Sequence, residues 1–105
     1  MLVIKSREGE VIDFISDYTP VGPFGVHADR ENPKLWSVTH AKTGMTAQGN
    51  AFPAFPSKKQ AVQYCNILLK MPIDWDFQTE TEMRLKNDME MVKVLHHAAN
   101  KEARR

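Results

Sequence analysis

Residues 35–48, LWSVTHAKTGMTAQ, have the pattern of an antiparallel β-hairpin. Trp36, Val38 and His40 alternate with smaller polar residues, which is typical of a strand with one buried face. The AKTG tetrad that follows ends in a glycine, which tolerates the positive φ of a tight turn, and the residues after it form the returning strand. The chain is therefore predicted to contain an antiparallel sheet.

The part of the chain before this hairpin supplies further short strands. Residues 2–5 and 11–15 are rich in β-branched side chains and are separated by a polar turn that contains Gly9. Residues 24–27 form another strand, after a segment interrupted by prolines, which lack the amide donor of a central strand. Residues 1–50 are therefore predicted to be mostly β-structure, in an antiparallel sheet of four to five strands.

Residues 57–71 have the clearest helical pattern. Ser57 and Gln60 form a capping box, in which side chains satisfy free backbone N–H groups. Apolar residues then recur at helical spacing: Ala61, Tyr64, Cys65, Leu68 and Leu69. Phe52 and Phe55, which precede the helix, are expected to dock on the sheet, because leaving each in water costs roughly 1.5–3 kcal/mol.

A second capping box, formed by Thr79 and Glu82, opens a longer helical pattern over residues 79–103. A helix of that length spans about 37 Å, more than the width of a small domain, about 30 Å, so its end is expected to protrude or to pack on another surface. Its predicted core stripe is Leu85, Met91, Val92, Leu95, Ala98 and Ala99. The whole pattern predicts one α+β domain, residues 1–105, in which an antiparallel sheet packs against one amphipathic helix and a long C-terminal helix lies alongside.

Length and composition limit the functions that the chain can have. Its 105 residues are 42% hydrophobic, enough for a core without metal or disulfide support, and 14 basic against 13 acidic residues do not make a general cationic coat for nucleic acid. Cys65 is the only cysteine, which excludes an internal disulfide and favours a reducing compartment. The chain turns charged after four residues and has no apolar run near about 20 residues, so we expect no signal peptide, no membrane helix and a location in the cytoplasm of a prokaryotic host cell.

The residue types that most often carry catalysis or bind metals are not arranged for either role. His96 and His97 are adjacent and point about 100° apart on a helix, so they do not chelate one ion. The other two histidines lie in predicted strands, where we expect them to fill space. Asp74 and Asp76 lie on one side of an extended segment and suit a divalent cation, but no third carboxylate completes a site, and we expect Asp76 to cap or flank the last helix instead. We therefore expect no catalytic residue, no metal site and no cofactor.

Lys58 and Lys59 lie in the first turn of the 57–71 helix, where cations oppose the helix dipole at about 0.3–1 kcal/mol each. Free backbone N–H groups, the positive dipole end and two ammonium groups together favour an anion, such as a phosphate or the carboxylate of a partner. Three further cations in predicted turns extend this anion- or nucleic-acid-binding site: Lys42, Lys34 and Arg30. The alternative is that all these cations are simply solvated.

The 79–103 helix also has an apolar second face, since Met83 and Val94 fall away from its core stripe. An adaptable apolar face suits a partner surface or a homodimer, and a helix buried on two sides explains it equally well. The predicted partner or dimer interface consists of Leu85, Met91, Val92, Leu95, Met83 and Val94.

Residues 36–77 resemble a pattern of small phage and plasmid proteins, in which a W-x-V-T-H strand and a T-G turn precede an F-x-S-K-K-x-A helix start and a closing D-W. Such proteins often inhibit host machinery or host defence, as anti-CRISPR and antirestriction proteins do. The resemblance implies a non-enzymatic binding protein that inhibits a host protein or nucleoprotein by covering its surface.

Residues 57–61, SKKQA, are also similar to the start of the second helix of double-stranded-RNA-binding domains, whose lysines contact phosphates. The chain departs from that motif in two ways, because a hairpin replaces the first helix and Phe52, Pro53, Phe55 and Pro56 replace its glycines. This resemblance implies the alternative function, a nucleic-acid-binding module that uses the lysine-rich start of the helix.

Overall fold

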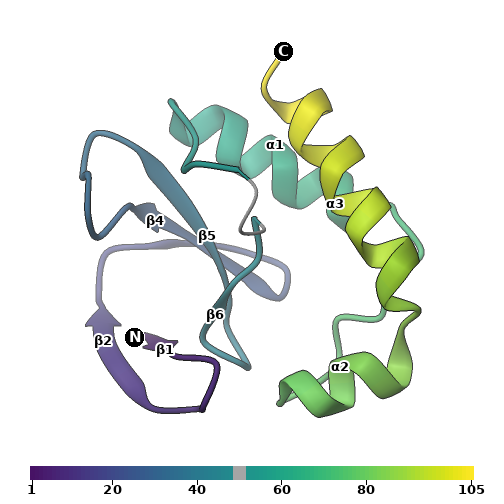
Figure 1. Cartoon of the computed structure of the whole chain (residues 1–105). Helices are drawn as coiled ribbons and strands as arrows, with labels where there is room; N and C mark the ends of the chain where they lie inside the picture. Colours follow the sequence, from purple (N-terminus) through teal and green to yellow (C-terminus); the bar gives the residue numbers. More distant parts are fainter. Residues whose placement is uncertain (49–51) are drawn as a thin grey trace.

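The computed structural model describes residues 1–48 and 52–105. Within these residues there are six strands and three helices, which confirms the α+β class. In chain order they are β1 (Leu2–Lys5), β2 (Val11–Ile15), β3 (Thr19–Val21), β4 (Phe24–Ala28), β5 (Trp36–His40), β6 (Met45–Thr46), α1 (Lys58–Leu69), α2 (Glu80–Lys86) and α3 (Met89–Ala103) (Figure 1). The end of the predicted β-rich part, residues 49–50, lies outside the described residues.

The strands form two antiparallel sheets. β3, β4, β5 and β6 form a four-stranded sheet in chain order, and β3, at its edge, lies in the proline-interrupted segment for which no strand was predicted. β1 and β2 form a separate two-stranded sheet, which is joined to the β5–β6 turn by a backbone hydrogen bond from Lys5 N to Gly44 O, 2.8 Å. Gly44 has a φ of 71°, and a Cβ there would lie 2.6 Å from the carbonyl oxygen of Val3. Glycine therefore permits both the tight turn and the close approach of β1.

α1 packs on β4 and β5 and closes the main core (Figure 1). Tyr64 and Leu68 on its inner face are fully buried, in one apolar cluster with residues of both strands. Half of the predicted capping box is confirmed, because the hydroxyl of Ser57 accepts a hydrogen bond from the N–H of Gln60 at 3.2 Å. The side-chain oxygen of Gln60 has no partner among the described residues, so the reciprocal bond of the box is not formed.

The segment between the sheet and α1 is anchored by its two phenylalanines. Phe55 exchanges backbone hydrogen bonds of 2.7 and 2.8 Å with Trp36 and is fully buried, as predicted. Phe52 contacts α3 instead, where its ring centroid lies 5.2 Å from that of His97 and 5.4 Å from the guanidinium carbon of Arg104. The two side chains thus tie one short segment to the sheet and to the last helix.

The C-terminal helix begins at Met89, so the prediction of a single helix over residues 79–103 is wrong. Asn87 and Asp88 have extended backbones, and the carboxylate of Asp88 caps α3 by accepting from the N–H groups of Glu90 and Met91 at 3.0 and 3.4 Å. Short polar side chains compete with the helix for backbone groups, which favours a boundary at such a pair. α2 and α3 are both shorter than a small domain is wide, so their length does not require an end to protrude.

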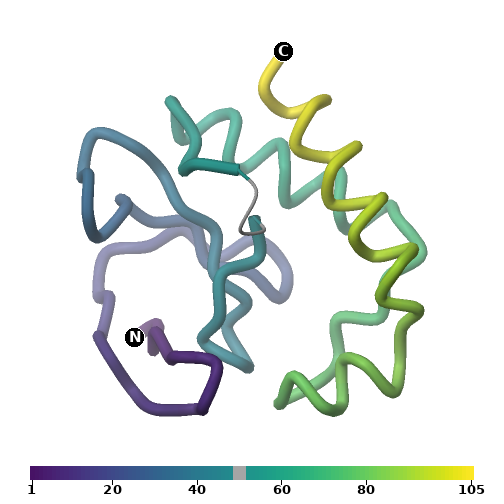
Figure 2. Tube along the Cα trace, in the orientation of Figure 1, coloured from purple at the N-terminus to yellow at the C-terminus, as the bar shows by residue number. Residues whose placement is uncertain are grey.

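α3 packs against α1, as the tube in Figure 2 shows. Ala99 and Ala103 are buried in one cluster with residues of α1, and Asn100, which is fully buried, donates to the carbonyl of Gln48 at 3.0 Å. Val92 is buried on the same helix. None of the described helices has both the length and the apolar character that a membrane-spanning segment needs.

Candidate functional site

The cations predicted to form one anion site lie at different places. The ammonium of Lys58 lies 5.8 Å from the ring centroid of Trp36, at the start of β5. Lys42 follows the other end of that strand, and the two ends of β5 are about 13 Å apart. Lys59 is exposed on α1, and Lys34 is exposed in the β4–β5 loop. The structure therefore does not bring the predicted cations together into one patch.

Two of these cations are engaged in ion pairs. Lys42 Nζ lies 2.5 Å from a carboxylate oxygen of Asp76, and this hydrogen bond lowers the pKa of Asp76. Arg30 Nε lies 2.8 Å from a carboxylate oxygen of Asp13 in β2, which lowers the pKa of Asp13. Asp76 is thus a partner of a lysine, and Arg30 ties the β4–β5 loop to the first hairpin.

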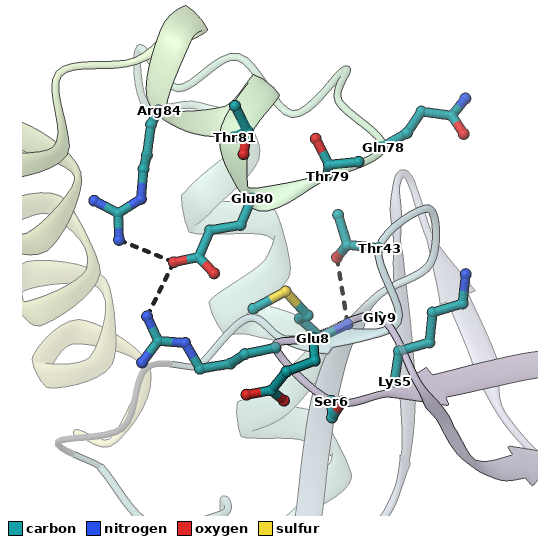
Figure 3. A pocket seen from close by; sticks show the side chains of 12 residues that line it. Lys5, Ser6, Glu8, Gly9, Thr43, Gln78, Thr79, Glu80, Thr81 and Arg84 are labelled. Atoms are coloured by element: carbon teal, nitrogen blue, oxygen red, sulfur yellow. Dashed lines mark hydrogen bonds and ion pairs between the residues drawn. The ribbon is translucent and has the colours of Figure 1, made fainter.

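A different group of charges lines a hollow of about 510 Å³ between the β1–β2 turn, the β5–β6 turn and α2 (Figure 3). The guanidinium groups of Arg7 and Arg84 lie 3.1 and 2.9 Å from the same oxygen of Glu80. Both hydrogen bonds lower the pKa of Glu80, and the one from Arg84 has the larger effect. The charges in this hollow therefore hold α2 to the hairpin. This contact was not predicted, because Arg7 and Glu80 are 73 positions apart in the chain.

A smaller hollow of about 140 Å³, here called the α3 chamber, lies between β6, the segment that precedes α2, and the two C-terminal helices. Its wall is mainly apolar and flexible: Met45, Ala47, Trp75, Phe77, Met83, Met89 and Val92. His40 and His96 also line it, and Glu80 lies in the wall that it shares with the larger hollow.

The two histidines of the α3 chamber differ in their hydrogen bonds. His40 Nδ1 lies 2.9 Å from the hydroxyl of Thr43 and Nε2 lies 2.9 Å from the carbonyl of Trp75, so Nε2 carries the proton and both ring nitrogens have partners. His96 stacks on Trp75 with ring centroids 5.9 Å apart. The Nε2 atom of His96 and the Nε1 atom of Trp75 are buried, and neither has a partner among the residues described. Burial lowers the pKa of both His40 and His96.

The predicted interface residues of the C-terminal segment divide into two groups. Leu85 and Val94 are 82% and 67% exposed, and Met91 is exposed as well, so the prediction that Leu85 and Met91 lie in the core is wrong. Val92 is buried as predicted, whereas Met83 and Leu95 are half-buried and Ala98 is exposed. The break at residues 87–88 changes the direction in which these side chains point, so one continuous stripe over residues 79–103 does not exist.

The strand β2 has an apolar surface that the sequence did not single out. Val11, Ile12 and Phe14 are about half exposed or more, and Phe14 is 59% exposed. Within the described residues β2 pairs only with β1, whose other side faces the turn at Gly44. One edge of β2 is therefore open, and three apolar side chains lie along it.

Cys65 and His27 are both buried inside the fold. Burial raises the pKa of the Cys65 thiol to about 12, so that it stays protonated. His27 Nδ1 lies 2.8 Å from the carbonyl of Ala28, and its Nε2 lies 2.9 Å from the hydroxyl of Thr39. No group of three or more metal-ligating side chains gathers in residues 1–48 and 52–105. Comparison with protein-family models, with curated proteins and with solved structures found no significant match.

Proposed function

We propose that this protein is a non-enzymatic binding protein that takes an extended strand of a partner protein onto the open edge of β2. The observation that carries this proposal is the presence of exposed Val11, Ile12 and Phe14 on a strand whose second edge has no neighbour among the described residues. An added strand would satisfy the free backbone groups of that edge and cover the apolar side chains. It would also replace the carboxylate of Asp13 as the acceptor for the N–H of Phe14, which lies 2.8 Å from it. Covering the exposed part of each side chain contributes on the order of 1 kcal/mol.

The charges around β2 indicate the chemistry of the partner strand. Glu8 and Glu10 precede β2 and Asp17 follows it, and all three are exposed without an ion pair among the described residues. A partner strand with alternating apolar residues and basic residues near its ends complements this edge. The resemblance of residues 36–77 to phage and plasmid proteins supports a host protein, or a protein of a host nucleoprotein, as the partner, and occupation of its strand would inhibit it.

The alternative of a nucleic-acid-binding module has less support. Lys59 and Lys34 are exposed, but Lys42 and Arg30 are already paired with carboxylates. A duplex binder needs several cations along one face, because each contact with a phosphate adds to affinity and to its dependence on salt.

Affinity capture from a bacterial lysate, with three forms of the protein, tests the proposal. The wild type and the Leu85→Lys variant are expected to retain the same stoichiometric protein, whereas Phe14→Lys loses it by about tenfold or more, since a charge on the open edge opposes burial. Leu85→Lys is the matched control, because it places the same charge on an apolar side chain that is exposed elsewhere. Loss by Leu85→Lys alone, retention by all three forms, or capture of nothing by the wild type contradicts the proposal.

Two further measurements separate the other occupants of the edge. Sedimentation of the pure protein at micromolar concentration is expected to give the 12.0 kDa chain, and a mass of two chains would make a second copy the occupant. A retained complex that disappears after nuclease treatment, and that depends on Lys58 and Lys59 rather than on Phe14, would support the nucleic-acid alternative instead.

A further inference from the structure

We propose that the carboxylate of Asp13, held in place by Arg30, blocks pairing of the open edge of β2 with a second copy of this chain. The inference rests on the proposed function, because it takes this edge to be able to accept a strand. It concerns the regulation of that edge: the ion pair opposes a second copy more strongly than it opposes a partner strand.

The direction of the backbone groups in β1 is fixed by its contact with the β5–β6 turn. The N–H of Lys5 donates to the carbonyl of Gly44 at 2.8 Å, and a Cβ on Gly44 would lie 2.6 Å from the carbonyl oxygen of Val3. The backbone groups of Lys5 and Val3 therefore point away from β2. Because this direction alternates along a strand, Leu2 and Ile4 are the residues of β1 that bond to β2.

This alternation decides which residue of β2 faces the open edge. Leu2 pairs with Ile15 and Ile4 pairs with Asp13, so the backbone groups of Ile15 and Asp13 point toward β1. Phe14 lies between them and directs its N–H and C=O to the open edge. A strand that adds to this edge must bond to Phe14.

The N–H of Phe14 already has an acceptor. It lies 2.8 Å from one carboxylate oxygen of Asp13, and Arg30 Nε lies 2.8 Å from the other oxygen. The carboxylate is therefore held at both oxygens, between the edge of β2 and the β4–β5 loop. The hydrogen bonds from Arg30 and from this N–H lower the pKa of Asp13, so the carboxylate stays charged at neutral pH.

The effect of this carboxylate is doubled when the incoming strand is a second copy. Two copies that pair antiparallel about Phe14 displace two carboxylates and bring their like charges to one edge, where they repel. A partner strand displaces only one carboxylate. Since one hydrogen bond changes an equilibrium by about fivefold, the ion pair weakens self-pairing by roughly 25-fold and partner binding by about fivefold.

The strand β2 has a second feature that protects open edges. Ile4 pairs with Asp13 whereas Lys5 pairs with Val11, so Ile12 is an extra residue in a β-bulge. Bulges and charged side chains are two ways in which folded proteins keep an edge strand from pairing with another copy. The bulge interrupts regular pairing before Asp13, and the carboxylate of Asp13 blocks the part of the edge that follows.

Sedimentation of the pure protein from micromolar to millimolar concentration tests the proposal. Asp13→Ala removes the carboxylate and is expected to form a dimer roughly 25-fold more readily than the wild type. Arg30→Gln leaves the carboxylate but no longer holds it, so it should dimerise to a degree between these two. Asp76→Ala is the matched control, because it removes a carboxylate that also pairs with a cation, but in the segment that precedes α2.

Three outcomes count against the proposal. An Asp13→Ala variant that stays at 12.0 kDa over the whole range overturns it, and so does an Asp76→Ala variant that dimerises equally. An Arg30→Gln variant that behaves as the wild type contradicts the role of Arg30.

A proline at the outward-facing position shows whether the dimer forms through this edge. Phe14→Pro, combined with Asp13→Ala, removes the N–H that a second copy needs, whereas the bonds to β1 come from the neighbouring residues. This double variant should be a monomer, while Phe14→Ala in the same background keeps the N–H and should keep part of the dimer. A dimer that persists with the proline forms through another surface and overturns the proposal. Circular dichroism shows whether each variant is folded.

The outcomes for this proposal and for the strand-binding function are separable, because sedimentation of the pure protein needs no partner. Capture of a partner by the wild type, without dimerisation of Asp13→Ala, would remove the block and leave the strand-binding function. Dimerisation of Asp13→Ala through Phe14, without capture of any partner by the wild type, would support the block and contradict the strand-binding function.

Discussion

α1 and α2 both begin after a capping hydroxyl that the sequence predicts, that of Ser57 and that of Thr79, yet they are held in place by different forces. α1 has twelve residues, of which four are buried in the core, whereas α2 has seven residues and none of them is buried. α2 is attached through polar contacts at its two ends instead. Arg7 pairs with Glu80 at its start, and the side chain of Asn87 after its end exchanges hydrogen bonds of 2.8 and 2.9 Å with the backbone of Asp74.

This difference shows how one small fold can combine a rigid core with a movable wall. Apolar burial fixes α1 wherever the core is intact, because its side chains have no other dry place to pack. α2 separates two hollows and depends on charges that water and salt weaken. We therefore expect α2 to open locally at a lower free energy than α1.

The largest expected effect comes from matched leucine truncations in the two helices. Leu68→Ala in α1 should lower the free energy of unfolding by about 2–5 kcal/mol, because it leaves a cavity at a fully buried position. Leu85→Ala in α2 should change it by no more than about 0.5 kcal/mol, since that side chain is 82% exposed. Urea unfolding of both variants measures the difference, and similar losses would show that α2 belongs to the same cooperative core.

A loss of stability of intermediate size is expected on lowering the pH, because His40 and His96 are protonated before Glu80 loses its ion pairs in α2. Burial lowers the pKa of His40, and the charge of Lys42 adds to this effect; burial also lowers the pKa of His96. In the unfolded chain these two imidazoles bind protons at about pH 6.5, whereas in the folded chain they do so only at lower pH. Their contribution to the free energy of unfolding is therefore fully present above about pH 6.5 and is lost as the pH falls below it. Glu80 has a lowered pKa and keeps its ion pairs over this range.

Urea unfolding between about pH 8 and about pH 5 measures this loss, and His96→Leu is the control, since it should remove part of the dependence on pH. Stability that stays constant over this range would mean that neither imidazole is kept neutral by the fold.

The smallest expected effect on global stability comes from Arg7→Ala, which removes one ion pair between the hairpin and α2. Because Arg7 is mostly exposed, the free energy of unfolding should fall by less than about 1 kcal/mol. Amide hydrogen exchange should nevertheless become faster in α2 and remain unchanged in α1. Arg105→Ala is the control, because Arg105 pairs with Glu102 near its own helix end and joins no separate elements. Equal acceleration in both helices, or none in α2, would contradict the view of α2 as a wall held by charges.

The parts of the fold that were predicted correctly depend on residues close together in the chain. Ser57 caps the Gln60 amide, the hydroxyl of Thr79 accepts from the N–H of Glu82 at 3.1 Å, and Gly44 has the positive φ expected of its turn. The break before Met89 was missed because the apolar spacing continues across it, although Asn87 and Asp88 are the residue types that end and cap helices.

The candidate sites were largely hidden from sequence reasoning. Lys58 and Lys42 are both basic and both near turns, but only the path of β5 shows that they lie at opposite ends of a strand. Phe14 belongs to an ordinary strand pattern, and its significance depends on β2 having no second neighbour among the described residues. The sequence marks such residues as apolar and leaves their exposure open.

Local structure in this protein thus follows from the amino-acid sequence, because caps, turns and short strands are made by groups within a few positions of one another. The hollows and surfaces follow from contacts between distant segments, such as the 35 positions that separate His40 from the Trp75 carbonyl and the 73 that separate Arg7 from Glu80. Their geometry depends on how the two sheets and three helices pack together, since burial, ion pairing and the absence of a hydrogen-bond partner are properties of a place in space and not of a residue type.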